Sequence, residues 1–141
     1  MTLPLRSACA FAALALASAL AAQTKPDASQ VAYGKYITEE VARCQDCHTP
    51  RLESGEFDKT KWMKGATLDF GPLKPSEKWH KTSPDLTPGS KLWERWGEDG
   101  LRKFMKTALN PRGGHADAPM PPYKYQDKEA DAVVAYLKTL K

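Results

Sequence analysis

Cysteine is scarce in this sequence, and so are long apolar runs and clusters of like charge. Of the three cysteines in 141 residues, Cys9 directly precedes an apolar stretch near the start, and only Cys44 and Cys47 lie beyond that stretch. No run of five or six like charges and no basic stripe interleaved with aromatic residues occurs, so we expect no nucleic-acid partner. No strand-like alternation and no internal repeat occurs either. The predicted fold class is therefore all-α.

The first 22 residues predict a secretory signal peptide. Arg6 is the only charge before Lys25, and the stretch from Ala10 to Ala22 is almost entirely Ala and Leu. Small residues at its end fit cleavage near Ala21 or Ala22. The apolar run is shorter than the roughly 20 residues that cross a bilayer. We therefore expect export to the periplasm, with no stable membrane insertion after cleavage.

The remaining chain predicts one small domain behind a short leader. Removal of the signal leaves about 119 residues, enough for a single domain. Arg6 is lost with the signal, so 20 basic residues face 17 acidic ones, a net charge of +3. Residues 23–29 predict a flexible leader, and residues 30–141 predict the domain. The mean hydropathy of the whole chain is −0.57, and a large apolar cofactor would supply the core that such a polar chain lacks.

Three segments predict helices, and the part between the first two predicts loops. The helical segments are 30–43, 98–109 and 128–140. Gly34 weakens the first by roughly 1 kcal/mol relative to Ala but permits close packing against another helix. Asp127 is the expected N-cap of the last. The stretch 49–91 is rich in proline and glycine, and a loop of this length is reasonable if it wraps a ligand.

The two remaining cysteines form a CxxCH motif, Cys44-Gln45-Asp46-Cys47-His48. Two thiols three positions apart on a helical turn are spaced to add to the two vinyl groups of one haem. The histidine that follows then lies beneath the iron as its proximal ligand. The motif therefore predicts one covalently bound haem c and its iron.

Three alternative interpretations compete for this cysteine pair. A structural disulfide suits an exported protein. A thioredoxin-like redox couple requires a βαβ context, which the sequence lacks. A zinc site needs two further ligands besides the cysteines, and only His80 and His115 remain besides His48, both in loops without a ligand pattern. Haem attachment is the favoured interpretation.

An electron-transfer haem needs a second axial ligand that stays in place. The candidates are Met63, Met105, Met120, His80 and His115. Met105 belongs to the apolar stripe of a predicted helix, which favours core packing. Met120 has prolines on both sides, and these stiffen the backbone that would hold its thioether against the iron. Met120 is therefore the predicted distal ligand, and a Met/His pair gives a higher potential than two histidines.

In this order, the motifs resemble class I cytochrome c. The CxxCH motif comes early, Met120-Pro121 comes late, and a helix ending near Leu140 closes the chain, so that the resemblance covers Val31 to Lys141. It implies a fold of three to five helices with long loops wrapped around one haem. In this family the first and last helices cross near the haem edge, which Gly34 and Tyr136 fit.

The resemblance also implies further roles for residues and partners. In the family a loop proline carbonyl accepts the N–H of the proximal histidine; Pro84 is the preferred match, and Pro72 is the other candidate. The segments Cys47–Arg51 and Ser83–Pro88 resemble cytochrome modules that serve periplasmic dehydrogenases. The implied function is electron transfer between a dehydrogenase, another cytochrome or a terminal oxidase, with no catalysis by the chain itself. A haem sensor or catalyst and a dedicated dehydrogenase subunit are the alternatives.

Overall fold

The structure is a computed structural model that describes residues 27–141. The predicted signal peptide and most of the predicted leader lie outside these residues. The described chain forms helices and loops with only isolated β-bridges, which confirms the all-α prediction. Its α-helices are α1 (Ala28–Tyr36), α2 (Gln45–His48), α3 (Lys91–Thr107) and α4 (Asp127–Leu137). Between residues 27 and 141 no helix is both long and apolar enough to cross a membrane.

The first helix starts two residues before the predicted start and changes its winding before it ends. Residues Ile37–Val41 continue α1 as a π-helix, in which the Ala42 amide donates to the Ile37 carbonyl at 2.8 Å. Arg43 then adopts a left-handed backbone conformation with φ of 52°. Single π-helical turns of this kind are rare in proteins, and many of those that are known lie at functional sites. Here the wide turn ends the helix directly before Cys44 and α2.

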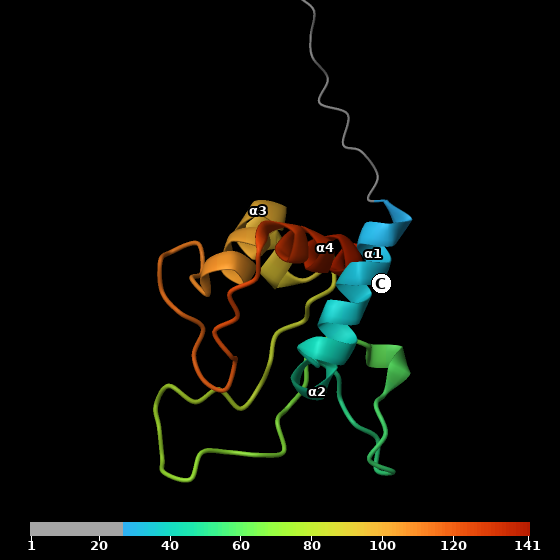
Figure 1. The fold of residues 1–141 in the computed structure, drawn as a ribbon. Coiled ribbons are helices and arrows are strands. Elements are labelled where there is room, and N and C mark those ends of the chain that lie inside the picture. The colour runs from blue at the N-terminus through green and yellow to red at the C-terminus, as the bar shows by residue number, and fades with distance from the viewer. Residues whose placement is uncertain (1–26) are drawn as a thin grey trace, which may run out of the picture.

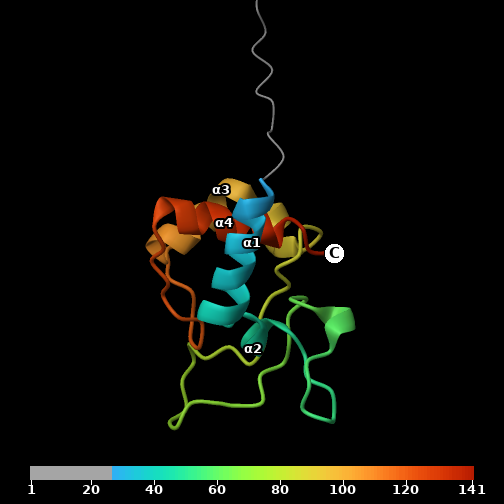
Figure 2. The same ribbon diagram turned by 45° about the vertical axis from the view of Figure 1, so that its right-hand side comes forward.

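Helices α1 and α4 cross each other in close contact (Figures 1 and 2). Gly34 lies at the crossing, where a Cβ atom would come within 1.8 Å of the Ala132 carbonyl oxygen and 2.9 Å of the Tyr136 Cβ. The Tyr136 hydroxyl donates to Glu39, and the Trp62 indole N–H donates to that hydroxyl at 3.3 Å. The close packing expected for Gly34 is thus present, because only a hydrogen fits at this position.

The third helix is longer than predicted because it consists of two helical pieces. Ser90 caps the first, with its hydroxyl accepting from the Trp93 amide at 3.4 Å. Gly97, with φ of 61°, breaks the helical backbone, and the second piece runs on to Thr107. Ala108 ends it in a left-handed conformation. The predicted helix 98–109 therefore corresponds to the second piece, and its predicted end at Leu109 is two residues too late.

The last helix closes the core. Its N-cap is Gln126 rather than the predicted Asp127, because the Gln126 amide donates to the Glu129 carboxylate at 2.8 Å as part of a capping box. The helix ends at Leu137, three residues before the predicted end. The core gathers apolar residues from the helices and the loop that joins them: Ile37, Met63, Leu86, Leu92, Leu101, Phe104, Met105, Ala130, Val133, Val134, Tyr136 and Leu137.

The stretch between α2 and α3 consists of turns and loops, as predicted, apart from one 3₁₀ turn at Lys59–Lys61. Its yellow-green part lies at the end of the molecule away from α3 and α4 (Figure 2). Leu73 is fully exposed on this part, and a Cβ added to nearby Gly71 would meet no atom within 4 Å. The tip of the loop is therefore free of contact with the helical core.

We predict that Gly34→Ala lowers the free energy of unfolding by about 2 kcal/mol or more, because the new methyl group meets main chain that cannot move aside alone. Urea unfolding of the haem-loaded protein measures the change. Gly71→Ala is the matched control, since its methyl group has open space. Equal stability of the two variants would show that α1 and α4 do not approach as closely as described.

A charged network joins α3 to the end of the chain. Glu98 accepts from Lys138 at 2.6 Å and from Arg102 at 2.9 Å, and Arg102 also donates to Asp131. The hydrogen bond from Lys138 is the main cause that lowers the pKa of the Glu98 carboxyl, and Arg102 adds to it. A carboxyl with a lowered pKa stabilises the fold above its unfolded-state pKa and loses that contribution as the pH falls.

We predict that Glu98→Gln lowers stability at pH 6 by at most about 1 kcal/mol, since these side chains are partly exposed and water screens them. The difference from the parent protein should shrink as the pH falls below the ordinary glutamate pKa of about 4.3 and vanish near complete protonation. Denaturant unfolding at pH 6 and at pH 3 measures it. Glu77→Gln, in an exposed loop, is the control and should show no such trend.

Candidate functional site

Two of the three chemically reactive residues of the CxxCH motif, Cys47 and His48, lie on the single turn of α2, and the third, Cys44, is the N-cap of that turn. The His48 amide donates to the Cys44 carbonyl at 2.8 Å, and the Cys47 amide donates to the same oxygen at 3.2 Å. This turn places the two thiols three residues apart, and neither forms a disulfide. The Gln45 side chain fixes the turn to the preceding helix by donating to the Glu39 carbonyl at 2.7 Å. The spacing that haem attachment requires is therefore built into the backbone.

The thiols have the wrong electrostatics for a redox-active cysteine pair. Burial raises the pKa of Cys44 to about 12 and also raises the pKa of Cys47, to which the negative charge of Asp46 contributes. Redox-active cysteines in CxxC motifs have pKa values lowered below about 8.5, because the thiolate is the reactive form. The thioredoxin-like interpretation therefore finds no support in this site.

The His48 ring is oriented by one hydrogen bond. Its Nδ1 lies 2.8 Å from the Pro84 carbonyl oxygen. A carbonyl can only accept, so Nδ1 carries the proton and Nε2 keeps a lone pair for a metal. The ring is 4% exposed, and burial lowers its pKa more than the hydrogen bond raises it. His48 is therefore neutral, which is the form that binds iron. Pro72, the other proline considered, lies exposed in the loop.

The loop that carries Pro84 is clamped to the motif by its neighbour Ser83. The Ser83 hydroxyl donates to the Cys47 carbonyl at 2.5 Å and accepts from the Ala66 amide at 2.9 Å. The Gly65 amide donates to the His48 carbonyl at 2.9 Å. Gly65 has φ of 82°, and a Cβ there would lie 2.6 Å from the Ser83 carbonyl oxygen. Glycine is therefore required where the two loop segments meet.

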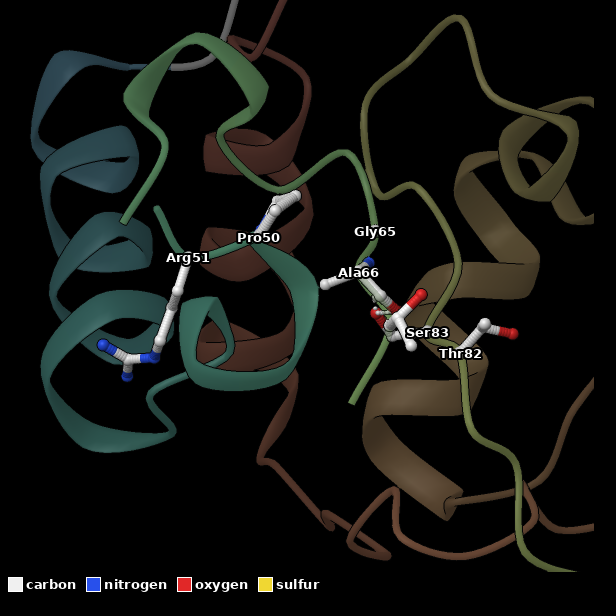
Figure 3. A pocket seen from close by; sticks show the side chains of 7 residues that line it. Pro50, Arg51, Gly65, Ala66, Thr82 and Ser83 are labelled. Atoms are coloured by element: carbon white, nitrogen blue, oxygen red, sulfur yellow. Dashed lines mark hydrogen bonds between the residues drawn. The ribbon is translucent and has the colours of Figure 1, made fainter. Parts of the chain in front are cut away.

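An open cavity of about 520 Å³ lies beside this clamp (Figure 3). Its lining residues come from the segment after α2 and from both sides of the clamp: Pro50, Arg51, Gly65, Ala66, Thr67, Thr82 and Ser83. The Arg51 side chain points away from the others, and its guanidinium lies 3.5 Å from the Asp46 carboxylate. The cavity wall is thus made mostly of small, uncharged side chains.

The predicted distal ligand, Met120, lies in the loop between α3 and α4, partly buried against the core. Its amide donates to the Asp117 carbonyl at 3.3 Å. Further along the same loop, the Tyr123 hydroxyl donates to the Ala42 carbonyl at 2.9 Å, and the Tyr125 amide donates to the Met105 carbonyl at 2.9 Å. The Tyr123 bond holds the Met120 loop against the helix end that leads into Cys44, and the Tyr125 bond holds it against α3.

The other candidates for a distal ligand are engaged elsewhere. Met105 is buried in the core on α3, as expected. Met63 is fully buried, and its amide donates to Thr49 Oγ1 at 2.9 Å. His80 pairs with Asp117 at 3.0 Å, and His115 Nδ1 lies 3.2 Å from the Ala108 carbonyl oxygen. Met120 is the candidate that combines partial burial with a position in the loop near Cys44.

Three buried side-chain polar atoms have no partner among the described residues: Thr38 Oγ1, Gln45 Oε1 and the Trp79 indole nitrogen. Of these, the Trp79 nitrogen is a donor and suits a haem. The Trp79 indole nitrogen is buried without a hydrogen-bond acceptor, whereas the Trp93 indole donates to the Leu86 carbonyl at 2.6 Å. The Trp79 ring packs edge-on against Phe70. A buried donor without an acceptor costs free energy, and a haem propionate is an acceptor that would remove this cost. Sequence patterns do not single Trp79 out, because its environment is formed by residues distant in the chain.

The described residues do not provide the further ligands that a zinc site at the CxxCH motif would need. Within residues 27–141, no group of three or more His, Cys, Asp or Glu side chains is arranged to hold a metal ion. The residues present fit a haem instead: two thiols on one turn, a neutral histidine with a free Nε2, a methionine in the loop between α3 and α4 and an indole donor without an acceptor.

We predict that Ser83→Ala lowers the free energy of unfolding by about 1–2 kcal/mol, because the Ala66 amide and the Cys47 carbonyl both lose their partner. Chemical denaturation of the haem-loaded protein measures the loss. Ser76→Ala serves as the control, since the Ser76 hydroxyl accepts only one exposed hydrogen bond, from the Lys78 amide. A similar small effect for both variants would contradict the clamp.

Comparison with known proteins identifies relatives of this chain. The family profile described as cytochrome c matches residues 31–141. A diheme c-type cytochrome of Cereibacter sphaeroides is 30% identical over an alignment of 110 residues, which covers 74% of this chain and 33% of the relative. The cytochrome c subunit of gluconate 2-dehydrogenase from Pantoea cypripedii is 31% identical over an alignment of 118 residues, which covers 78% of this chain and 26% of the relative. The matches thus span about a third and about a quarter of these longer proteins.

Proposed function

This chain belongs to the cytochrome c family, and on that premise we propose that it is a periplasmic carrier of single electrons with one covalently bound haem c. Cys44 and Cys47 would hold the haem, His48 would bind its iron on the proximal side, and Met120 would bind it on the distal side. The observation that carries this proposal is the neutral His48 ring, oriented by Pro84 with Nε2 free, one residue after the second thiol.

The residues of this chain would keep the iron site still while its charge changes. A bound haem would supply the one-electron chemistry through its iron. The Pro84 carbonyl orients the His48 ring and makes its Nε2 more electron-rich. The buried His48 ring and the apolar core would exclude water from a bound iron. A site that does not rearrange on oxidation suits electron transfer and needs no catalytic group.

The proposed partners are other periplasmic redox proteins. One relative is the cytochrome c subunit of a gluconate dehydrogenase, which favours a dehydrogenase as the electron donor. A terminal oxidase or another cytochrome is the proposed acceptor. The chain carries charges of both signs, which suits brief, salt-sensitive encounters with such partners.

We predict that the protein matured with haem-attachment machinery has a low-spin c-type visible spectrum, including the weak long-wavelength band of a methionine–iron bond. Met120→Ala should abolish this band, because alanine offers no ligand. Met63→Leu is the matched control and should retain the band, since Met63 packs in the core and leucine has a similar volume.

Other spectra would lead to other conclusions. A high-spin spectrum of the parent protein, with carbon monoxide binding readily, would instead favour a haem sensor or catalyst. A band lost in Met63→Leu but kept in Met120→Ala would assign the distal ligand to Met63. A protein without any haem spectrum would overturn the whole proposal.

A dedicated dehydrogenase subunit is the second candidate function, and the gluconate dehydrogenase relative favours it. We predict that the free carrier elutes alone at physiological salt and reduces or oxidises its partner in turnover. A subunit would instead copurify with a dehydrogenase in fixed stoichiometry and remain bound at that salt concentration. Gel filtration of the protein from its native periplasm, followed by haem staining, distinguishes the two.

A further inference from the structure

We propose that the segment His80–Pro84 is a strap that joins the proximal and distal sides of the site, with His80 as a positioning residue for the Met120 loop. One end of the strap holds His48 through Pro84, and the other holds the Met120 loop through His80. The role of the strap at the iron rests on the proposed function, whereas the contact between the two loops is independent of it.

The distal end of the strap, His80, forms two hydrogen bonds with the Met120 loop. The His80 amide donates to the Ala118 carbonyl at 2.8 Å, beside a parallel β-bridge between Trp79 and Ala118. The His80 Nε2 lies 3.0 Å from an Asp117 carboxylate oxygen. Because a carboxylate only accepts, Nε2 is the donor in this bond. Asp117 in turn accepts from the Met120 amide through its own carbonyl at 3.3 Å, so the bond reaches the turn that holds Met120.

The proximal end of the strap is fixed independently. Its residues pair with the incoming side of the loop: the Leu68 amide donates to the Lys81 carbonyl at 2.8 Å, and the Ser83 amide donates to the Ala66 carbonyl at 2.9 Å. Ser83 and Pro84 then hold Cys47 and His48. The strap is therefore anchored on the His48 side of the site by bonds that involve neither the His80 nor the Asp117 side chain.

The arrangement in space agrees with this connection. In Figures 1 and 2 the orange loop between α3 and α4 descends from the helices and meets the yellow-green loop. Apart from the strap, the bonds that hold the Met120 loop to the helices lie at His115, before Met120, and at Tyr123 and Tyr125, beyond it. On the side before Met120, the strap holds the loop through the His80–Asp117 bond and the His80 amide bond to Ala118. Without the His80–Asp117 bond, only the amide bond would join the strap to this side of the loop.

The side chains of the bond are exposed, His80 by 61% and Asp117 by 50%. Exposed pairs contribute little to global stability. Loops, however, open locally at a much lower free-energy cost than global unfolding, so a weak bond changes their opening noticeably. The strap should therefore act on the departure of Met120 from the iron while leaving the unfolding of the whole protein nearly unchanged.

The test is a double-mutant cycle on the haem-loaded ferric protein with His80→Ala, Asp117→Ala and the double variant. Imidazole at saturating concentration can bind the iron only after Met120 leaves, so the limiting rate reports the opening of the loop. We expect each single variant to raise this rate about two- to fivefold, and the double variant to raise it no further. Lys78→Ala and Glu77→Ala remove exposed charges from the same loop and should leave the rate unchanged.

Two further measurements separate the possible failures. The melting temperature should hardly change in the strap variants. A merely structural role would instead lower the melting temperature while the imidazole-binding rate rises. Hydrogen exchange of the segment 115–122 reads the contact without reference to the iron, and faster exchange in both single variants is expected. Unchanged exchange and unchanged imidazole binding would overturn the strap. A parent protein without a methionine–iron band would refute the proposed ligand, while hydrogen exchange would still decide whether the strap exists.

Discussion

The contact between the backbones of α1 and α4 at Gly34 is the constraint on which the rest of the site depends. The crossing fixes the direction in which α1 ends, and the π-helical turn that follows delivers Cys44 to the start of α2. The same crossing seats Tyr136 against Glu39. Any side chain at position 34 would part the helices, and the attachment turn would move with them.

Local signals in the sequence are sufficient for the parts of the site that are made of neighbouring residues. The CxxCH motif lies on one helical turn, as its spacing requires, and the family profile confirms the resemblance to cytochrome c. Gly34 fits the close packing expected of it, because a glycine that weakens a helix is most useful where a second helix approaches. The all-α class follows from periodicities that burial in the core enforces at α3 and α4.

The features that could not be predicted depend on contacts between distant residues or on competing local choices. The first piece of α3 was missed, although Ser90 before Leu92 and Trp93 is a helix-start signal, because Gly97 interrupts the periodicity. Gln126 caps α4 in place of Asp127, since the Glu129 side chain reaches back to its amide. The bond between His80 and Asp117 spans 37 residues, and no pattern along the chain indicates it.

The unattached tip of the middle loop has a practical meaning for building with this fold. Leu73 projects into solvent and the neighbouring Gly71 is surrounded by free space, while the paired base of the loop is held by the bonds at residues 66–68 and 81–83. Chain can therefore be lengthened or replaced at the tip without disturbing the base. An affinity peptide or an electrode-binding cysteine inserted there would lie at one end of the molecule. This loop is therefore a suitable place at which to attach the protein to a surface.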